Sequence, residues 1–364
     1  MQNKTIAFYC SSLTRGGAER VFANLAEYFA DKGYTVYLVT QYKQEDEYPL
    51  SLGISRILSD LTPKEEKKGR LGNFFARYFK LRNIFKRIKP DIVFSCNGKN
   101  NFMAECANFG LHDKVVVSVV ADPKMEYPSK RMQFLAKALF RFADGIVFQT
   151  REAASFFPKA IRKKGVILPN SINPQFIRPR FEGEREKEIV AVGRLDDNKN
   201  HAMLLTAFAG ICEEFPDYRV VIYGEGENRE KLQQMIPELG LQGRAFLPGR
   251  VDHIEEKIYK STLFVMTSDT EGMPNAMLEA MSLGLCVIST DCPCGGPGEM
   301  IISGENGYLI PVRDTEKLKE QMAYCLSHPD EMERVGRNAS MIQKSMSPIE
   351  VNKKWEGYFR KVMG

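Results

Sequence analysis

Short apolar segments rich in β-branched residues alternate with helix-length segments along this 364-residue chain. Apolar runs of this kind are typical of strands that are buried on both faces of a parallel sheet. We predict strands at residues 5–10, 35–40, 91–96, 114–120, 145–150 and 165–170, and then at 188–193, 218–224, 244–249, 262–268, 285–290 and 307–312. The alternation predicts an α/β protein with two doubly wound, Rossmann-like domains.

The length also favours two domains, because single cores seldom grow this large. Residues 170–188 are rich in proline and charge and have no sustained period. We therefore predict an N-terminal domain, a linker, a C-terminal domain and a final helix, over residues 1–170, 171–187, 188–346 and 347–364.

No basic and apolar export signal precedes the first predicted strand, so we expect a cytoplasmic protein with its eight cysteines reduced. No apolar run approaches the roughly 20 residues that span a bilayer. Any membrane contact is therefore expected to be peripheral, on the inner face of the cell membrane.

A basic and aromatic segment stands out against a modest net charge of +5. Residues 64–89 carry ten Lys or Arg against two Glu, and the aromatic residues among them have helical spacing. Two interpretations of a helix over residues 71–88 stay open: it lies on anionic lipid, or it packs its aromatic face on a sheet. No nucleic-acid binding motif accompanies it, so nucleic acid is not an expected partner.

Glycines and cations follow several predicted strands, where ligands bind in open α/β sheets. Gly16 and Gly17 precede a helix and would let the backbone approach an anion, but they lack the spacing of a dinucleotide site, which argues against hydride transfer. Arg194 and Lys199 follow the strand that ends at Gly193 and form a candidate diphosphate clamp.

Two glutamates, Glu271 and Glu279, lie eight residues apart around a Met-Pro turn and an otherwise apolar helix. A carboxylate in such a helix needs a partner, either an internal Arg or Lys or the hydroxyl groups of a ligand. The first turn of the helix would offer backbone N–H groups to an anion.

Five motifs occur in order: GGAER (16–20), VGRL with NKN (192–200), GEG (224–226), EGMPNAMLE (271–279), and GGPGEMI with GENGYLIP (295–311). With them the chain resembles the retaining glycosyltransferases of family GT4, which have the GT-B fold, over nearly its whole length. The resemblance implies two Rossmann-like domains that face each other across a cleft, and a C-terminal helix that crosses back to the first domain.

The resemblance also implies roles for single residues. Arg194 and Lys199 would bind the donor diphosphate and stabilise its growing charge, while Glu271 would hold the donor sugar. The phosphate would help deprotonate the acceptor on the front face. The implied donor-binding residues are Gly16, Gly17, Gly193, Gly224, Arg250 and Val251 beside the base, Gly272, Met273, Pro274, Asn275, and Glu279 at the ribose.

Some features depart from the family pattern. The loop at residues 118–123 has no His or Arg where many relatives have one, and Asp122 is our candidate on the acceptor side. We expect no cofactor and no metal, since Cys292 and Cys294 lack the second pair that a zinc site needs. The four histidines, His112, His201, His253 and His328, are predicted to be solvated rather than catalytic.

The expected function is transfer of a hexose or N-acetylhexosamine from a nucleotide sugar, expected to be a UDP-sugar, to a lipid-linked glycan in surface polysaccharide synthesis. Two alternatives from other classes stay open. A nucleotide-sugar epimerase of this fold would convert the donor without an acceptor. A non-catalytic nucleotide-binding or glycan-binding module is disfavoured by the intact set of charged residues.

Overall fold

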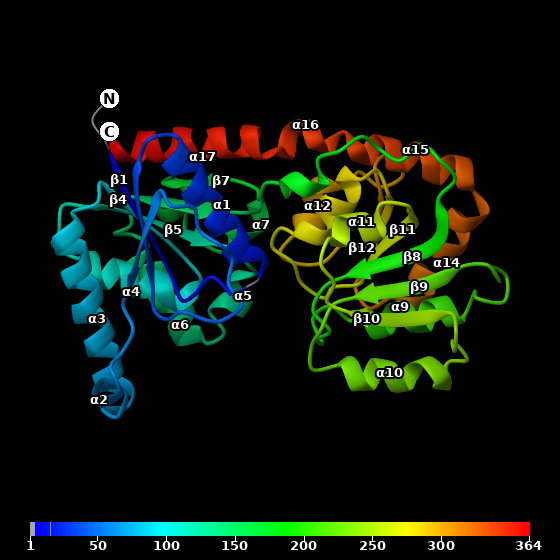
Figure 1. Cartoon of the computed structure of the whole chain (residues 1–364), viewed down its shortest axis with the longest axis horizontal. Coiled ribbons are helices and arrows are strands. Elements are labelled where there is room, and N and C mark those ends of the chain that lie inside the picture. The colour runs from blue at the N-terminus through cyan, green and yellow to red at the C-terminus, as the bar shows by residue number, and fades with distance from the viewer. Residues whose placement is uncertain (1–3, 15) are drawn as a thin grey trace. The chain divides into compact units, whose positions relative to one another are not determined.

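The computed structural model describes residues 4–14 and 16–364, which divide into two compact units (Figure 1). The first unit comprises residues 1–170 and 351–364, and the second comprises residues 171–350. Within each unit, helices cover both faces of a parallel sheet (Figure 1).

The first unit contains a seven-stranded sheet with the order β3-β2-β1-β4-β5-β6-β7. Its strands are β1 (Thr5–Cys10), β2 (Thr35–Thr40), β3 (Ile54–Leu58), β4 (Ile92–Cys96), β5 (Lys114–Val119), β6 (Gly145–Phe148) and β7 (Gly165–Ile167). Its helices are α1 (Gly17–Asp31), α2 (Pro63–Glu66), α3 (Gly69–Ile88), α4 (Gly98–Asn108), α5 (Pro123–Glu126), α6 (Lys130–Leu139), α7 (Arg151–Ser155), α8 (Lys159–Arg162) and most of α17 (Pro348–Met363). Strand β3 was not predicted, because it is an edge strand in which only Ile54 is buried and it therefore has no apolar run.

The second unit contains a six-stranded sheet with the order β10-β9-β8-β11-β12-β13. Its strands are β8 (Glu186–Val192), β9 (Arg219–Tyr223), β10 (Ala245–Gly249), β11 (Ser261–Met266), β12 (Cys286–Thr290) and β13 (Tyr308–Ile310). Its helices are α9 (His201–Ala209), α10 (Arg229–Glu238), α11 (Ile254–Ile258), α12 (Asn275–Ser282), α13 (Gly296–Met300), α14 (Thr315–Ser327), α15 (Pro329–Ser340) and α16 (Ile342–Met346), with a 3-10 turn, η1, at Pro174–Phe176.

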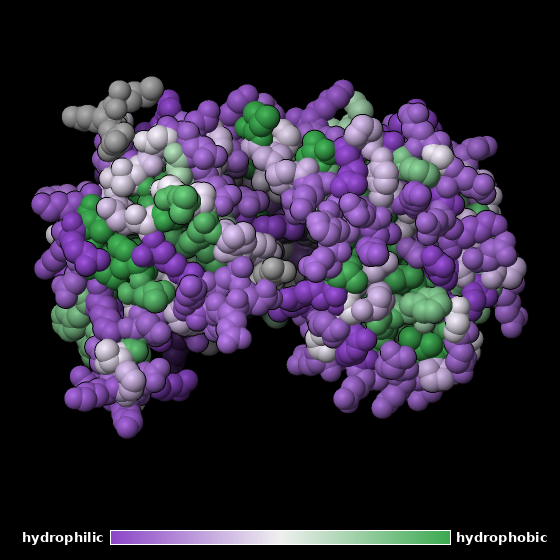
Figure 2. Space-filling model, in the orientation of Figure 1, coloured by the Kyte–Doolittle hydropathy of each residue, from purple (hydrophilic) through white to green (hydrophobic). Residues whose placement is uncertain are grey.

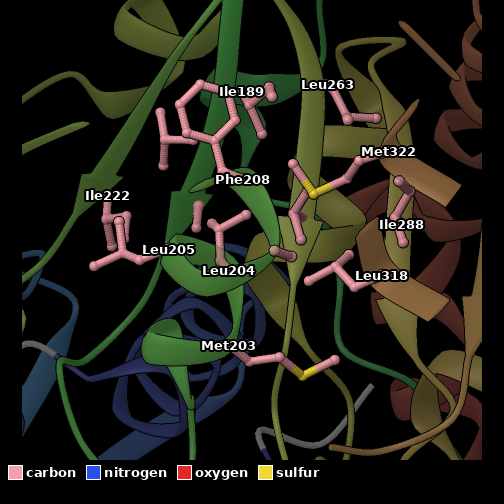
Figure 3. Close-up of a cluster of buried hydrophobic side chains, with 14 of the residues drawn as sticks. Ile189, Met203, Leu204, Leu205, Phe208, Ile222, Leu263, Ile288, Leu318 and Met322 are labelled. Atoms are coloured by element: carbon pink, nitrogen blue, oxygen red, sulfur yellow. The ribbon is translucent and has the colours of Figure 1, made fainter. Parts of the chain in front are cut away.

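Both faces of the second sheet are buried, because side chains alternate along a strand. Along β8, Ile189 joins the hydrophobic cluster beneath α9 and α14, whereas Val190 joins the cluster on the opposite face. Figure 3 shows the first cluster, in which Ile189 and Leu263 of the sheet meet Phe208 and Met322 of the helices. With both faces covered, the strand ends are the parts of the sheet open to a ligand.

Residues 171–187, which we predicted as a linker, belong to the second unit. Ile172 and Phe176 are buried in the cluster that includes α12. The Ile172 N–H donates a hydrogen bond to the carbonyl of Met346 at 2.9 Å, and the Ser282 hydroxyl donates to the carbonyl of Phe176 at 2.8 Å. The many prolines and charged residues therefore indicate an irregular segment, but this segment packs on the core of the second unit.

The last helix, α17, packs on the first unit. Trp355 and Phe359 are buried, and the centres of their rings lie 5.2 and 5.3 Å from that of Phe94. Phe359 also stacks on Phe29, with 5.1 Å between ring centres. Residues at the end of the chain thus complete the core at its beginning.

Replacing Phe359 with alanine should destabilise the first unit by about 3–5 kcal/mol, because it leaves a cavity between aromatic rings. Trp355 is the single tryptophan of the chain, so its fluorescence follows urea unfolding of this unit. The matched control is Ile349→Ala at an exposed position of the same helix, which should change the stability by less than about 0.5 kcal/mol. Equal stability of the two variants would contradict this account of α17.

A buried acid in α4 predicts pH-dependent stability. Glu105 is 8% exposed, and burial raises the pKa of its carboxyl from 4.5 to about 8. Between those values the folded state binds more protons than the unfolded chain, so stability should fall by about 1 kcal/mol per pH unit as the pH rises. Unfolding curves of Glu105→Gln from about pH 5 to about pH 8 should lack this part of the slope. A slope unchanged from that of the unaltered protein would count against the raised pKa.

Candidate functional site

Predicted donor-binding residues lie at the carboxyl ends of neighbouring strands of the second sheet. Gly193 follows β8, Gly224 follows β9, and Arg250 follows β10. Glu271 lies in the loop between β11 and α12. The strand order β10-β9-β8-β11-β12 brings these loops to one edge of the sheet.

At this edge Lys199 and Glu271 form an ion pair between Nζ and Oε1. The two side chains are 18% and 13% exposed. Charges withdrawn from water interact more strongly than surface charges, and removing one of them leaves the other uncompensated. The structure therefore pairs Lys199, which we predicted to bind the diphosphate, with Glu271, which we predicted to bind the sugar.

The backbone around Lys199 is held by its neighbours. Its N–H donates to Asp196 Oδ1 at 3.0 Å, and its carbonyl accepts from the Thr267 hydroxyl at 2.9 Å. Asn200 has φ of 47°, a left-handed conformation that asparagine tolerates, and α9 begins at the next residue. These contacts fix the root of the lysine side chain.

Arg194 has a different setting from Lys199. Its side chain is 76% exposed and forms an ion pair with Asp196 at 3.0 Å. Exposed pairs of this kind contribute little to stability, so the guanidinium can turn toward a ligand at small cost. The candidate clamp thus consists of one fixed and one adaptable cation.

Some glycines at this edge are required by the packing of loops on each other. Gly224 has φ of +148°, and a Cβ there would lie 1.8 Å from the carbonyl oxygen of Gly193. A Cβ on Gly226 would lie 2.4 Å from the carbonyl oxygen of Leu195. This packing role exists with or without a ligand.

The segment 291–296, after β12, holds the backbone of Glu271, a role that the sequence analysis did not assign. The Glu271 N–H donates to the carbonyl of Pro293 at 2.6 Å, and the Cys294 N–H donates to the carbonyl of Glu271 at 2.9 Å. A Cβ on Gly296 would lie 1.7 Å from the carbonyl oxygen of Gly272. The sequence motif GGPGE, which starts at residue 295, could have indicated this role.

Helix α12 begins directly after Pro274, and no side chain caps this end. Gly272 and Met273 precede it, and Glu279 lies in its second turn with 6% exposure. Within the described part of the chain, the hydroxyl oxygens of Ser268 and Thr270 are buried and lack a hydrogen-bond partner. Buried polar atoms are usually paired, so these two hydroxyls join the candidate ligand-binding groups.

A pocket of about 510 Å³ adjoins the two loops, and its lining includes Asp197, Asn200, Asp269 and Arg313. Lys199 and Glu271 are not among the lining residues. The Arg313 guanidinium donates to both carboxylate oxygens of Asp269, at distances from 2.6 to 3.1 Å. The pocket is polar and large enough for a sugar, and it borders the Lys199–Glu271 pair without containing it.

His201 is a correction to the prediction of solvated histidines. It is 5% exposed at the start of α9, because the residues that follow Lys199 turn into the core. Burial, and secondarily the charge of Lys199, lower the pKa of its imidazole to about 4, so it is neutral at neutral pH. The other three histidines are exposed, as predicted.

The predicted residues of the first unit lie at helix starts. Gly16 precedes α1, which has no side-chain cap. Asp122 caps α5 by accepting from the Lys124 N–H at 2.8 Å, and its role on the side of the glycan acceptor stays a prediction.

In the same short helix, burial raises the pKa of the Glu126 carboxyl to about 7. A carboxyl with a pKa near neutrality is suited to proton transfer. A single glutamate forms no sequence motif, so Glu126 could not be singled out from the sequence.

The second half of the chain matches the family model of glycosyl transferases group 1 over residues 173–341, and the first half matches that of glycosyltransferase family 4 over residues 15–176. The chain belongs to the group 1 glycosyltransferases of family 4. Within the described residues, Cys292 and Cys294 belong to no cluster of three potential metal ligands.

Two curated relatives come from Campylobacter jejuni. One is the α-1,4-N-acetyl-D-galactosaminyltransferase named for GalNAc-α-(1→4)-GalNAc-α-(1→3)-diNAcBac-PP-undecaprenol, 24% identical with 96% of each chain covered. The other is an N-acetylgalactosamine-N,N'-diacetylbacillosaminyl-diphospho-undecaprenol 4-α-N-acetylgalactosaminyltransferase, 27% identical with 93% of each chain covered. Among solved structures, Anabaena HepE in complex with UDP has a TM-score of 0.83 at 17% identity and covers 98% of this chain and 100% of its own. The likeness and the two parallel-sheet units confirm the GT-B fold.

Replacing Gly296 with alanine should displace Gly272 and Glu271 and weaken binding of a nucleotide-sugar ligand at least about tenfold, since site geometry is sensitive to shifts of about 1 Å. Titration calorimetry with a ligand found by screening measures this change. Gly357→Ala, where an added Cβ meets no neighbour, is the matched control and should bind like the unaltered protein. Unchanged binding by Gly296→Ala in a folded protein would remove segment 291–296 from the site.

Proposed function

We propose that the protein is a retaining glycosyltransferase that moves a hexose or N-acetylhexosamine from a UDP-sugar to a lipid-linked glycan. The Lys199–Glu271 ion pair at the edge of the second sheet carries the proposal. The names of the two Campylobacter relatives, and the UDP in the HepE complex, support the acceptor and donor classes. The product would be part of a surface polysaccharide, made on the cytoplasmic side of the membrane.

The donor diphosphate would compete with Glu271 for Lys199 and attract the adaptable guanidinium of Arg194. When the bond between the anomeric carbon and the phosphate oxygen breaks, negative charge grows on the diphosphate, and the two cations stabilise it. Glu271, released from its ion pair, would accept hydrogen bonds from the hydroxyls of the sugar. The two cations supply the required positive charge, so the proposal includes no metal.

The remaining steps follow from retention of configuration. The acceptor oxygen would form its bond to the anomeric carbon on the face that the phosphate leaves, and its proton would pass to the departing phosphate oxygen. Glu279 and the start of α12 would bind the ribose and the phosphate. No covalent sugar–enzyme intermediate is required, which distinguishes the roles of Glu271 and Glu279 from the paired carboxylates of glycosidases.

Lys199→Ala should lower sugar transfer at least about 100-fold, because removing one group that stabilises developing charge typically costs this much. A screen of nucleotide sugars by thermal shift and by donor hydrolysis comes first, since a bound ligand raises apparent stability. Transfer to a lipid-linked acceptor is then measured with the donor that binds.

Lys344→Ala, at an exposed lysine of the same unit, is the matched control and should transfer normally. Lys199→Arg keeps the charge and should recover part of the activity. Full activity of Lys199→Ala would contradict the clamp, and conversion of one nucleotide sugar into its epimer without an acceptor would favour an epimerase.

A further inference from the structure

Helices α3, α4 and α6 form one layer over a face of the first sheet. Their inner sides share one hydrophobic cluster, to which Phe85 of α3, Ala104 of α4 and Ala136 of α6 contribute. Helix α3 packs beside α4, and α4 packs beside α6. The Arg82 guanidinium also links α3 to the end of α4, since it donates to the carbonyls of Ala107 and Phe109 at 2.9 and 2.7 Å.

The outer side of this layer exposes large apolar side chains, which we call the α3–α6 face. They are Leu71, Phe74, Phe75, Phe79, Phe109, Phe134, Leu135 and Phe142, with exposures from 41 to 77%. Of the two interpretations, packing of the aromatic face on a sheet holds for Phe85 and in part for Tyr78, but not for Phe74 and Phe75, which are exposed. Figure 2 shows hydrophobic surface in the region of α3. Gathered apolar surface of this kind marks an interaction site.

Basic residues outnumber acidic ones around the α3–α6 face. Neither α3 nor α6 contains an acidic residue. Nine exposed cations in or beside these helices have no ion pair among the described residues: Lys67, Lys68, Arg70, Lys86, Arg87, Lys89, Lys130, Arg131 and Arg141. On α14 of the second unit, by contrast, Lys317 and Lys319 pair with glutamates at 2.9 and 2.8 Å. The unpaired positive charge favours binding of an anionic partner.

We propose that the α3–α6 face docks on a bilayer of anionic phospholipid. The phenylalanine rings would enter the interface, and the long basic side chains would reach the headgroup phosphates. A second copy of the chain is a poorer occupant, because pairing two such faces would bring like charges together. No helix in the described ranges is long and apolar enough to cross the bilayer.

This inference rests on the proposed function for its purpose, since a lipid-linked acceptor lies in the same surface. It extends the basic segment 71–88 to a face built from three helices, in which Phe109, Phe134 and Phe142 lie outside that segment. Docking would place the first unit beside the acceptor and hold it there between turnovers. Because headgroup attraction is screened, docking should weaken as salt is added.

Vesicle flotation tests the proposal with the full-length protein. Vesicles of phosphatidylglycerol and phosphatidylethanolamine should bind the protein, and vesicles of phosphatidylcholine alone should bind it at least about tenfold less. Two variants separate the contributions: Phe75→Ser with Phe134→Ser removes apolar contacts on α3 and α6, and Arg70→Glu with Arg131→Glu reverses charges on both. Each should lower binding to the anionic vesicles at least about tenfold, because both contributions are needed.

The matched control is Ile302→Ser with Lys344→Glu, which makes the same kinds of change at exposed positions of the second unit and should bind like the unaltered protein. Thermal melts check that each variant is folded, and donor hydrolysis without vesicles should be the same in all of them. Equal binding of all variants to the anionic vesicles would contradict the proposed docking face, but it would not contradict the proposed transferase function. A dimer in solution that dissociates in the Phe75→Ser variant would overturn it in favour of a second copy. Normal docking with no donor hydrolysis would instead count against the proposed function.

Discussion

Burial of both faces of each parallel sheet is the constraint on which the rest of the structure depends. Strand residues that alternate between two hydrophobic clusters leave no face on which polar groups could meet a ligand. Polar chemistry is therefore confined to the loops at the strand ends. At one such edge of the second sheet the chain brings together a lysine, a glutamate and a set of glycines.

The Lys199–Glu271 pair gives that edge a defined unliganded state. Its two charges neutralise each other, so the largely buried lysine has a carboxylate partner before any donor arrives. The backbone on both sides of the pair is held by N–H groups that donate to Asp196 and to the carbonyl of Pro293, and by the Thr267 hydroxyl, which donates to the carbonyl of Lys199. An anionic donor would exchange one negative partner of Lys199 for another, so the lysine is paired in both states.

Much of this arrangement could be predicted from the sequence, because buried parallel strands and helix-opening glycines leave strong local patterns. All of the predicted strands form, although several end one to three residues early. What escaped prediction depends on tertiary packing: the half-exposed strand β3, the burial of His201, and the contact of Gly296 with Gly272. In the same way, the helical spacing of Phe75 and Phe79 predicts a helix, but only its neighbours decide which side is covered.

The return of α17 to the first unit has a consequence for synthesis of the protein. Phe29 and Phe94 are made early, yet the rings that cover them belong to residues near the end of the chain. While the second unit is being translated, the first unit must keep this aromatic surface uncovered, and uncovered surface invites aggregation. Completion of the first unit therefore has to await emergence of α17 from the ribosome, after the second unit has been translated.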